Sequence, residues 1–363
     1  MSTQKLFLVL APALSGLLLA TGCTSSSPNP EAQPAADHSV VLTDGDSHGY
    51  ITYDTKHEVL TGYTSDGTEK WRESRYFPTD VHCAGTCPDA VISATAELNE
   101  RESRTHTVWK TGGTSTVRSS PSRSLVVHWA RDENTWVATD ESSVIWSESG
   151  HIHTKKFTQG VSDALGRVSA DESTLVVSVQ PGSAQTWSGY RFRLRGAPLS
   201  PVLVSDALPG SIGCLSAQQE TMWTLGRKAV EYRLTTGRKI REVPQFSSDC
   251  ASSGSTTVLG TFSAGTDQAQ QQQTISLASA DRSAPLRKTV VNSDGEIGVF
   301  RDCGVVLSDG RLTALSADGG RQPTQIDAHS VLTTADGVVY SIGPSGRPER
   351  HGIAAGKRQC RIT

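Results

Sequence analysis

The stretch VLTGYTSDGTEKW, residues 59–71, carries the pattern that decides the fold. Residues that favour β-structure lead into a Ser-Asp-Gly turn, and a second short run ending in Trp71 follows. This pattern predicts two antiparallel strands joined by a tight turn. Related stretches are SSVIWSESGHIHTKKF (142–157), AVEYRLTTGRKIREV (229–243) and LTALSADGGRQPTQI (312–326), with weaker copies at 106–117, 190–204 and 275–291.

The turns recur at a regular interval along the chain. Between Gly67 and Gly319 the six intervals average about 42 residues, and each interval has room for about four short strands. No convincing amphipathic helix is found from Ser39 onward, so the sequence predicts an all-β protein. A unit of this length with four strands is typical of a β-propeller blade. The turn residues are Gly67, Gly112, Gly150, Gly196, Gly237, Arg282 and Gly319.

The number of turns predicts about seven blades, with six or eight as alternatives. Residues 329–363 either complete the ring together with the N-terminal strand or begin an eighth blade, because HSVLTTADGVVYSIG echoes HSVVLTDGDSHGYITY. Closure of a propeller ring removes exposed sheet edges, so both ends of the domain are expected at one seam.

The N-terminus has the features of an export signal. Lys5 precedes an uncharged run from Leu6 to Ala20, which is too short to cross a membrane as a helix. Small residues then lead directly to Cys23. The stretch resembles the lipobox of bacterial lipoproteins, with Ala20 in place of the usual Leu. The resemblance implies cleavage before Cys23 and lipidation of its thiol, with ordinary signal cleavage beside a chance cysteine as the alternative.

These features divide the chain into three parts. Residues 1–22 are expected to be a lipoprotein signal peptide, and residues 38–363 the propeller domain. Between them, residues 23–37 are rich in Ser, Pro and Ala, and no apolar residue larger than Ala follows the cysteine. Such a segment buries too little surface to offset its ordering entropy, so it is expected to be a disordered tether.

Six cysteines follow Cys23, and an even number in an exported protein predicts disulfides. Their order favours a small loop, a link between neighbouring repeats and a staple of the C-terminus, among fifteen possible pairings. A redox or metal site at HCAGTC is the alternative for the first pair, although its spacing is CxxxC rather than CxxC. The expected pairs are Cys83–Cys87, Cys214–Cys250 and Cys303–Cys360.

The stretches YRLTTGRKI (232–240) and GYTSDGTEKW (62–71) resemble the repeats of PQQ-like and WD40-like propellers. Together with the lipobox, the chain resembles propeller lipoproteins of the bacterial cell envelope, which implies a binding or scaffold role. PQQ itself is not expected, because the chain has no Cys-Cys pair and only Trp71 ends a repeat as that pattern requires. No cofactor is therefore expected.

Other chemical signals are weak. No GxSxG, HExxH, P-loop or calcium-loop motif occurs. His151 and His153 share one side of a strand but lack a third ligand, so a solvated strand is favoured over a metal site. Trp129, Trp136 and Trp146 are expected to pack between blades rather than to bind carbohydrate.

The sequence therefore favours a lipid-anchored binding or scaffold module on the extracytoplasmic side of the cell membrane. Its expected partners are the membrane and an envelope protein or carbohydrate. Nucleic acid is not expected, because the net charge is −3 and no Lys/Arg cluster occurs. The alternative is a hydrolase or lyase with a site in the central channel. An enzyme should bring titratable groups from several blades together with perturbed pKa values. A binding module should instead show a broad polar or aromatic face.

Overall fold

A computed structural model describes residues 39–363, except 75–76, 100–101, 120–123, 197, 217, 219, 245, 254–255, 263–272, 280–286, 292, 309, 317–319, 335–336 and 356–359. The predicted signal peptide, Cys23 and the predicted tether lie outside the described residues. The described part of the chain contains strands and turns without a helix, which confirms the all-β prediction. Consequently it contains no helix long and apolar enough to span a membrane.

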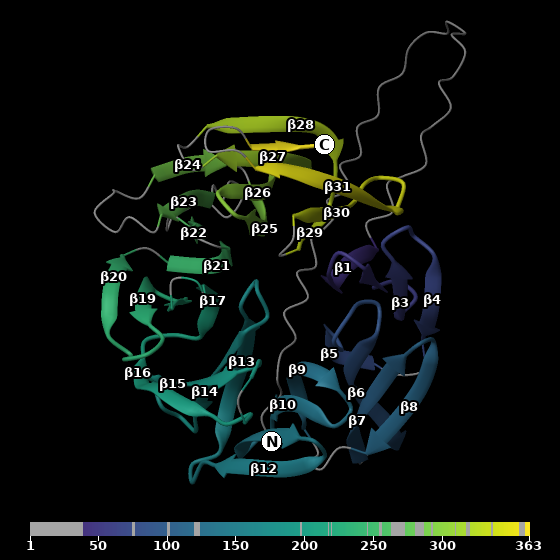
Figure 1. Ribbon diagram of the computed structural model, residues 1–363, viewed down its shortest axis with the longest axis vertical. Helices are drawn as coiled ribbons and strands as arrows, with labels where there is room; N and C mark the ends of the chain where they lie inside the picture. The colour runs from purple at the N-terminus through teal and green to yellow at the C-terminus, as the bar shows by residue number, and fades with distance from the viewer. Residues whose placement is uncertain are drawn as a thin grey trace, which may run out of the picture. The chain divides into compact units, whose positions relative to one another are not determined.

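Eight four-stranded antiparallel sheets form a β-propeller, arranged around a centre in chain order from purple to yellow in Figure 1. Each sheet is one blade, and its first strand is the innermost. The strands of blades 1 to 4 are β1 (Val40–Gly45), β2 (Gly49–Asp54), β3 (Val59–Thr64), β4 (Glu69–Glu73), β5 (Phe77–Cys83), β6 (Ala90–Asn99), β7 (Glu102–Thr111), β8 (Thr114–Ser119), β9 (Val126–Asp132), β10 (Thr135–Thr139), β11 (Ser143–Glu148), β12 (His151–Lys156), β13 (Val161–Val168), β14 (Thr174–Pro181), β15 (Trp187–Arg193) and β16 (Val202–Leu208).

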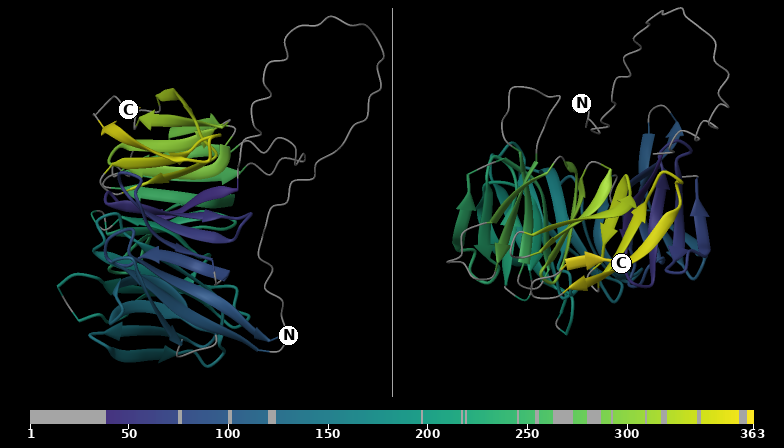
Figure 2. Two further views of the ribbon diagram at one scale, coloured as in Figure 1. Left: turned by 90° about the vertical axis from the view of Figure 1, so that its right-hand side faces the viewer. Right: turned by 90° about the horizontal axis from the view of Figure 1, so that it is seen from above.

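Blades 5 to 8 follow the same order of strands. Figure 2 shows the strands of neighbouring blades standing side by side, roughly along the axis of the ring. The strands are β17 (Ile212–Ser216), β18 (Thr221–Thr224), β19 (Ala229–Arg233), β20 (Lys239–Val243), β21 (Phe246–Ser253), β22 (Thr256–Phe262), β23 (Gln273–Ser279), β24 (Arg287–Val291), β25 (Ser293–Phe300), β26 (Cys303–Ser308), β27 (Arg311–Ser316), β28 (Arg321–Asp327), β29 (Ser330–Thr333), β30 (Val338–Ile342), β31 (Pro348–Ala355) and β32 (Cys360–Ile362).

The blade count is eight, one of the alternatives left open, rather than the favoured seven. Five of the seven turns found in the sequence join the third and fourth strands of a blade, namely those at Gly67, Gly112, Gly150, Gly196 and Gly237. Arg282 and Gly319 lie outside the described residues. The glycine at this turn adopts a left-handed backbone, with φ of 85° at Gly67 and 83° at Gly150, which explains why glycine recurs there. The C-terminal residues form a complete eighth blade from β29 to β32 without help from the N-terminal strand.

The ring closes where blade 1 meets blade 8, which lie side by side in Figure 1. The backbone N–H of Leu42 donates to Ser330 Oγ at 3.1 Å, and the hydroxyl of Tyr340 donates to the carbonyl of Asp46 at 3.0 Å. The rings of Tyr50 and Tyr340 are 4.6 Å apart. Hydrogen bonds and aromatic packing therefore close this seam without a shared strand.

The apolar core is divided among the interfaces between neighbouring blades. At the first interface, Ile51, Leu60 and Trp71 of blade 1 pack against Ile92 and Val108 of blade 2. A similar cluster joins blades 4 and 5. Each sheet is buried on both faces by its neighbours, as expected for strands with near-continuous apolar runs. The blades therefore stabilise one another around the ring.

Three disulfides join the six cysteines in the pairs that their order favoured. Cys83–Cys87 closes a small loop in blade 2, and Cys214–Cys250 joins the innermost strands of blades 5 and 6. Cys303–Cys360 joins β26 of blade 7 to the last strand of blade 8. This bridge staples the C-terminus as expected, one interface before the seam where blade 8 meets blade 1.

Candidate functional site

A Ser/Thr-Asp dipeptide recurs in the innermost strands of blades 1, 2, 4 and 6. In each strand the pairing register with the second strand shifts at the aspartate, so the residue sits at a β-bulge. Its carboxylate accepts the backbone N–H of the next residue at 2.7–3.0 Å. A bulge redirects a side chain, and here it places acidic groups on the strands that surround the axis. The aspartates are Asp44, Asp80, Asp163 and Asp249.

Two of these carboxylates hold His82, which lies on β5. His82 Nε2 is 3.1 Å from Asp80 Oδ2, and its Nδ1 is 3.8 Å from Asp44 Oδ2. Burial alone would lower the pKa of His82, but the charges of Asp80 and Asp44 outweigh burial and raise it to about 10. His82 is therefore an imidazolium at neutral pH, and two carboxylates from neighbouring blades neutralise it.

His128 on β9 lies close by in the opposite charge state. Its side chain is buried, its Nε2 lies 2.8 Å from Thr139 Oγ1, and burial lowers its pKa to about 4. The strand of blade 4 approaches closely at Gly166, where a Cβ atom would lie 2.4 Å from the Cβ of His128. His128 is therefore a neutral, tightly packed ring at neutral pH.

Arg167 and Asp249 add a second pair of opposite charges. Arg167 Nε donates to the carbonyl of Gly213 in blade 5 at 3.0 Å, and burial lowers its pKa. Burial raises the pKa of Asp249 to about 6, against the charge of Arg167 and the N–H of Cys250. Ionisable groups from blades 1, 2, 3, 4 and 6 thus meet on the innermost strands. Of these groups, only His82 belongs to a stretch singled out in the sequence, HCAGTC, although the repeated Ser/Thr-Asp dipeptide was a usable signal.

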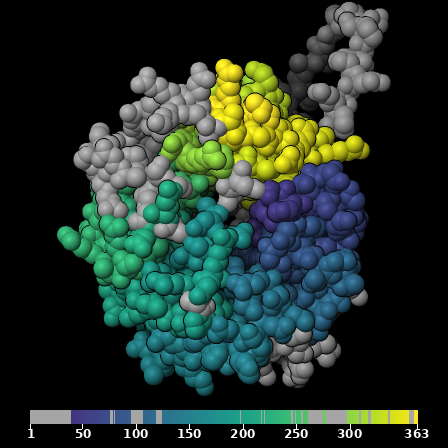
Figure 3. Space-filling model, viewed as in Figure 1, coloured from purple at the N-terminus to yellow at the C-terminus, as the bar shows by residue number. Residues whose placement is uncertain are grey.

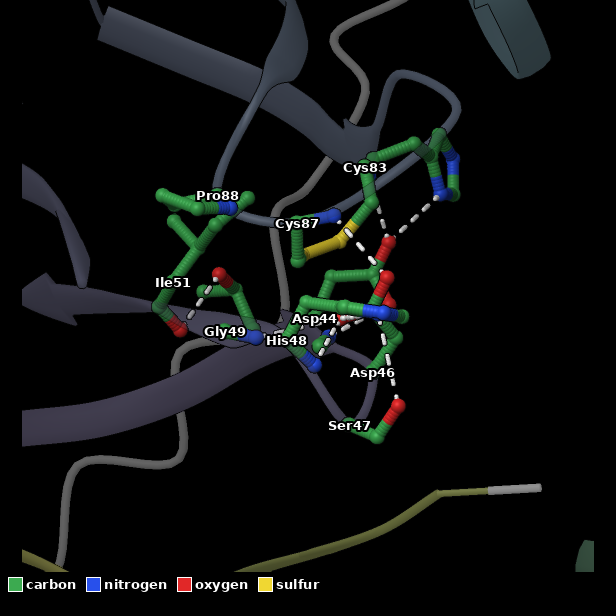
Figure 4. Close-up of a disulfide and its surroundings, with 12 residues drawn as sticks. Asp44, Asp46, Ser47, His48, Gly49, Ile51, Cys83, Cys87 and Pro88 are labelled. Atoms are coloured by element: carbon green, nitrogen blue, oxygen red, sulfur yellow. Dashed lines mark hydrogen bonds and ion pairs between the residues drawn. A yellow bond between two sulfur atoms is a disulfide. The ribbon is translucent and has the colours of Figure 1, made fainter. Parts of the chain in front are cut away.

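The Cys83–Cys87 loop is tied to the first turn of blade 1 (Figure 4). Asp46 Oδ2 accepts the N–H of Cys87 at 2.9 Å, and Asp44 Oδ2 accepts the N–H of Cys83 at 2.8 Å. Asp46 Oδ1 also accepts the N–H of His48 within its own turn at 2.7 Å. The disulfide loop therefore joins two neighbouring blades beside His82, which supports the structural role favoured for this pair.

Four of these groups line a cavity of about 720 Å³, which we call the channel mouth; they are Asp44, His82, His128 and Arg167. It opens on the upper face, which we define as the face that carries the turn between the first and second strands of each blade. Figure 3 shows the centre of the ring hollowed between the purple residues of blade 1 and the teal residues of blade 4. Lining residues from blades 1, 2, 3, 4 and 8 include His48, His82, Arg131, Arg167, Glu172 and Thr333.

A second cavity of about 870 Å³, which we call the arginine groove, opens on the upper face over blades 4 to 7. It is lined by Arg191, Arg193, Arg195 and Arg301. Arg195 and the first turn of blade 4 border both cavities, so the channel mouth and the groove adjoin. The upper face therefore presents a hollow surface with many charged side chains, to which all eight blades contribute.

The residues singled out in the sequence lie elsewhere or serve packing. His151 and His153 lie on β12, which is exposed throughout, and His153 stacks on Trp146 at 5.4 Å. Trp136 is buried between blades 2 and 3. Trp129 and Trp146 pack against an apolar cluster, and Trp129 also lines the channel mouth. Among the described residues, no group of three or more His, Cys, Asp or Glu side chains is arranged to hold a metal ion.

Solved structures with this fold come from several sources. BamB from Moraxella catarrhalis is 13% identical, with 85% of this chain and 95% of that chain covered and a TM-score of 0.52. The computationally designed Ika8 protein is 10% identical, with 87% and 97% covered and a TM-score of 0.54. Sqt1 from Saccharomyces cerevisiae is 9% identical, with 88% and 98% covered and a TM-score of 0.56. No family model and no curated protein matches the sequence. The solved structures establish a WD40-like, BamB-like β-propeller fold for this chain.

Proposed function

We propose that the protein is a lipid-anchored propeller that binds an envelope protein with its upper face, on the extracytoplasmic side of the cell membrane. The observation that carries this proposal is the pair of adjoining cavities, both lined with charged side chains, on one face of the ring. Propellers bind partners on such faces because the rigid blades hold the turns in fixed positions while the turns themselves vary.

The proposed location rests on two features. The segment before Cys23 resembles a lipobox, and three disulfides fit an oxidising compartment outside the cytoplasm. A lipid anchor contributes about 0.8 kcal/mol per buried methylene, so two or more acyl chains would hold the protein firmly at the membrane.

Substitution of the lipidation site tests the anchor. Cys23→Ala should move the protein from the membrane fraction to the soluble fraction, because the variant cannot accept the acyl chains. Ser26→Ala serves as the matched control and should stay with the membrane. Immunoblots of the two fractions measure the change, and a Cys23→Ala protein that remains in the membrane fraction contradicts the proposed anchor.

Crosslinking in cells tests the binding function. The anchored protein is crosslinked, purified and digested, and mass spectrometry maps which of its residues are joined to another protein. Crosslinks to one reproducible envelope protein that fall on the turns of the upper face support the proposal. Crosslinks confined to the outermost strands, such as the exposed β12, would place the binding surface elsewhere.

A catalytic function is a second candidate, and the convergence of ionisable groups from five blades favours it. Two of these groups, Asp249 with a pKa of about 6 and neutral His128, are in protonation states that general acid–base chemistry uses. His82 is less suited to this chemistry because two carboxylates hold it protonated. A panel of ester and glycoside substrates tests this candidate, and an activity lost in Asp249→Asn but retained in Asp163→Asn would support it.

A further inference from the structure

Three arginines of blade 4 lie at alternate positions along one edge of the arginine groove. Arg191 and Arg193 belong to β15, and Arg195 follows two residues later. Alternate residues of a strand point to the same side and are about 7 Å apart. The opposite end of the groove has Arg301 of blade 7, whose guanidinium lies 5.0 Å from the ring of Phe300. The groove is therefore flanked by cations on two sides.

Among the described residues, no carboxylate lies within ion-pair distance of these guanidinium groups, although the charge of Arg195 acts on nearby Glu172. Among the described residues, none of the four arginines forms an ion pair, whereas Arg241 and Arg311 elsewhere do. Arg191 Nε is buried and has no hydrogen-bond acceptor. A buried donor without an acceptor costs about 1–3 kcal/mol, so its presence in a cavity points to a ligand that supplies one.

The other groups in the groove define the charge of that ligand. Asp171 is occupied by its own turn, where its carboxylate accepts from the hydroxyls of Ser169 and Ser173. Glu220 is the second acidic residue of the lining, so four cations face two carboxylates. These carboxylates would repel a dense polyanion. A ligand with a few separated negative charges can instead pair with the arginines, which outnumber the carboxylates. Leu215 and Leu234 are also part of the lining, where they offer apolar contacts to aliphatic groups.

We propose that the arginine groove binds an acidic peptide segment of the partner, whose carboxylates pair with the arginines of blade 4. The planar guanidinium group forms two parallel hydrogen bonds with a carboxylate, which makes arginine clusters effective readers of acidic motifs. An extended peptide repeats its side chains with the same spacing as β15, so alternate acidic residues match alternate arginines. This inference rests on the proposed function of the upper face.

Fluorescence anisotropy of the full-length protein in detergent tests the inference. The probes are a fluorescein-labelled peptide of alternating Glu and Ala, the same peptide with Gln for Glu, and inorganic polyphosphate as a competitor. The Glu peptide should bind at least about ten-fold more tightly than the Gln peptide, and its affinity should fall steeply with salt. Polyphosphate should compete poorly.

Substitutions then locate the binding. Arg191→Gln and Arg193→Gln should each weaken the Glu peptide about ten-fold, as expected for one charge-assisted pair. Arg347→Gln, an exposed arginine outside the groove, should leave the affinity unchanged. Because Arg193 is exposed, its variant should fold even where Arg191→Gln does not, and circular dichroism verifies this.

Three results would overturn the inference. The first two are equal binding of the Glu and Gln peptides and full affinity in Arg193→Gln. Tight polyphosphate binding with no peptide binding would also overturn it, because the groove would then take a dense polyanion. The proposed function of the upper face is tested separately. If both arginine variants still crosslink to the same partner through the upper face, that function stands and only the proposed role of the groove is wrong.

Discussion

The channel mouth and the arginine groove share the upper face, but among the described residues of these two cavities, charged groups form ion pairs within the chain only in the channel mouth. In the channel mouth, His82 is held by Asp44 and Asp80, which come from neighbouring blades. In the groove, Arg193 is exposed and Arg191 Nε is buried, and neither residue forms an ion pair with another described residue. Charges that satisfy one another stabilise the ring, whereas charges left without partners are available to a ligand.

The largest effect on stability is expected from loss of the paired histidine. His82→Ala leaves Asp44 and Asp80 without the cation between them. Removing one partner of a buried ion pair costs about 3–5 kcal/mol, and because about a third of each carboxylate is open to solvent we expect about 2 kcal/mol. Chemical denaturation followed by circular dichroism measures the loss.

The control for this substitution is His48→Ala. His48 also lies beside a carboxylate, at 3.6 Å from Asp46, but 68% of its side chain is exposed. Exposed pairs contribute about 1 kcal/mol or less, so the control should change little. Equal losses in the two variants would show that the channel charges do not stabilise the ring.

A smaller effect is expected from pH. The pKa of His82 is about 10 in the folded protein and about 6.5 in the unfolded chain, so its stabilising contribution is complete below about pH 6.5. Between about pH 6.5 and pH 10 the folded protein keeps a proton on His82 that the unfolded chain has already released. The stabilising contribution of His82 is therefore lost progressively as the pH rises through this range. Buried His128 has a lowered pKa, so it reduces the stability of the folded protein at acidic pH instead, where the unfolded chain binds a proton first.

Thermal unfolding between about pH 6 and pH 10 measures this effect. The difference in Tm between the wild-type protein and His82→Gln should shrink as the pH rises. A difference that stays constant across this range would mean that the pKa of His82 is the same in the folded and unfolded states. The proposed stabilisation of its charged form by Asp44 and Asp80 would then be wrong.

The sequence predicted the regular part of this architecture well. Glycine turns at a fixed interval follow from the need for a left-handed backbone, so the repeat length and the all-β fold were readable. The eighth blade was not counted because the sequence between its last two strands, AAGKRQC, lacks the polar residues before glycine that mark turns such as SDG and TTG. The exact blade count depends on ring closure, which no single repeat encodes.

The two candidate sites depend on the ring as a whole. His82 and Asp44 are 38 positions apart, and their pairing follows only from knowing that both lie on innermost strands of adjacent blades. The alternation in YRFRLRG was visible in the sequence, yet its meaning depends on which acidic residues the neighbouring blades place opposite. Local patterns predicted strands and turns, whereas charge partners come from topology.

The smallest effect on stability is expected in the groove, where it should have the opposite sign. Arg193→Gln removes one of several cations that line the same groove, so it relieves repulsion in the unliganded protein. The free energy of unfolding should rise by about 0–0.5 kcal/mol, within the range of surface substitutions, and the gain should vanish at high salt. Denaturation at two salt concentrations measures it. A clear destabilisation would mean that Arg193 already has a partner within the chain, and the contrast with His82 would then fail. A variant that gains stability while losing peptide affinity would show that this part of the upper face gives up stability for binding.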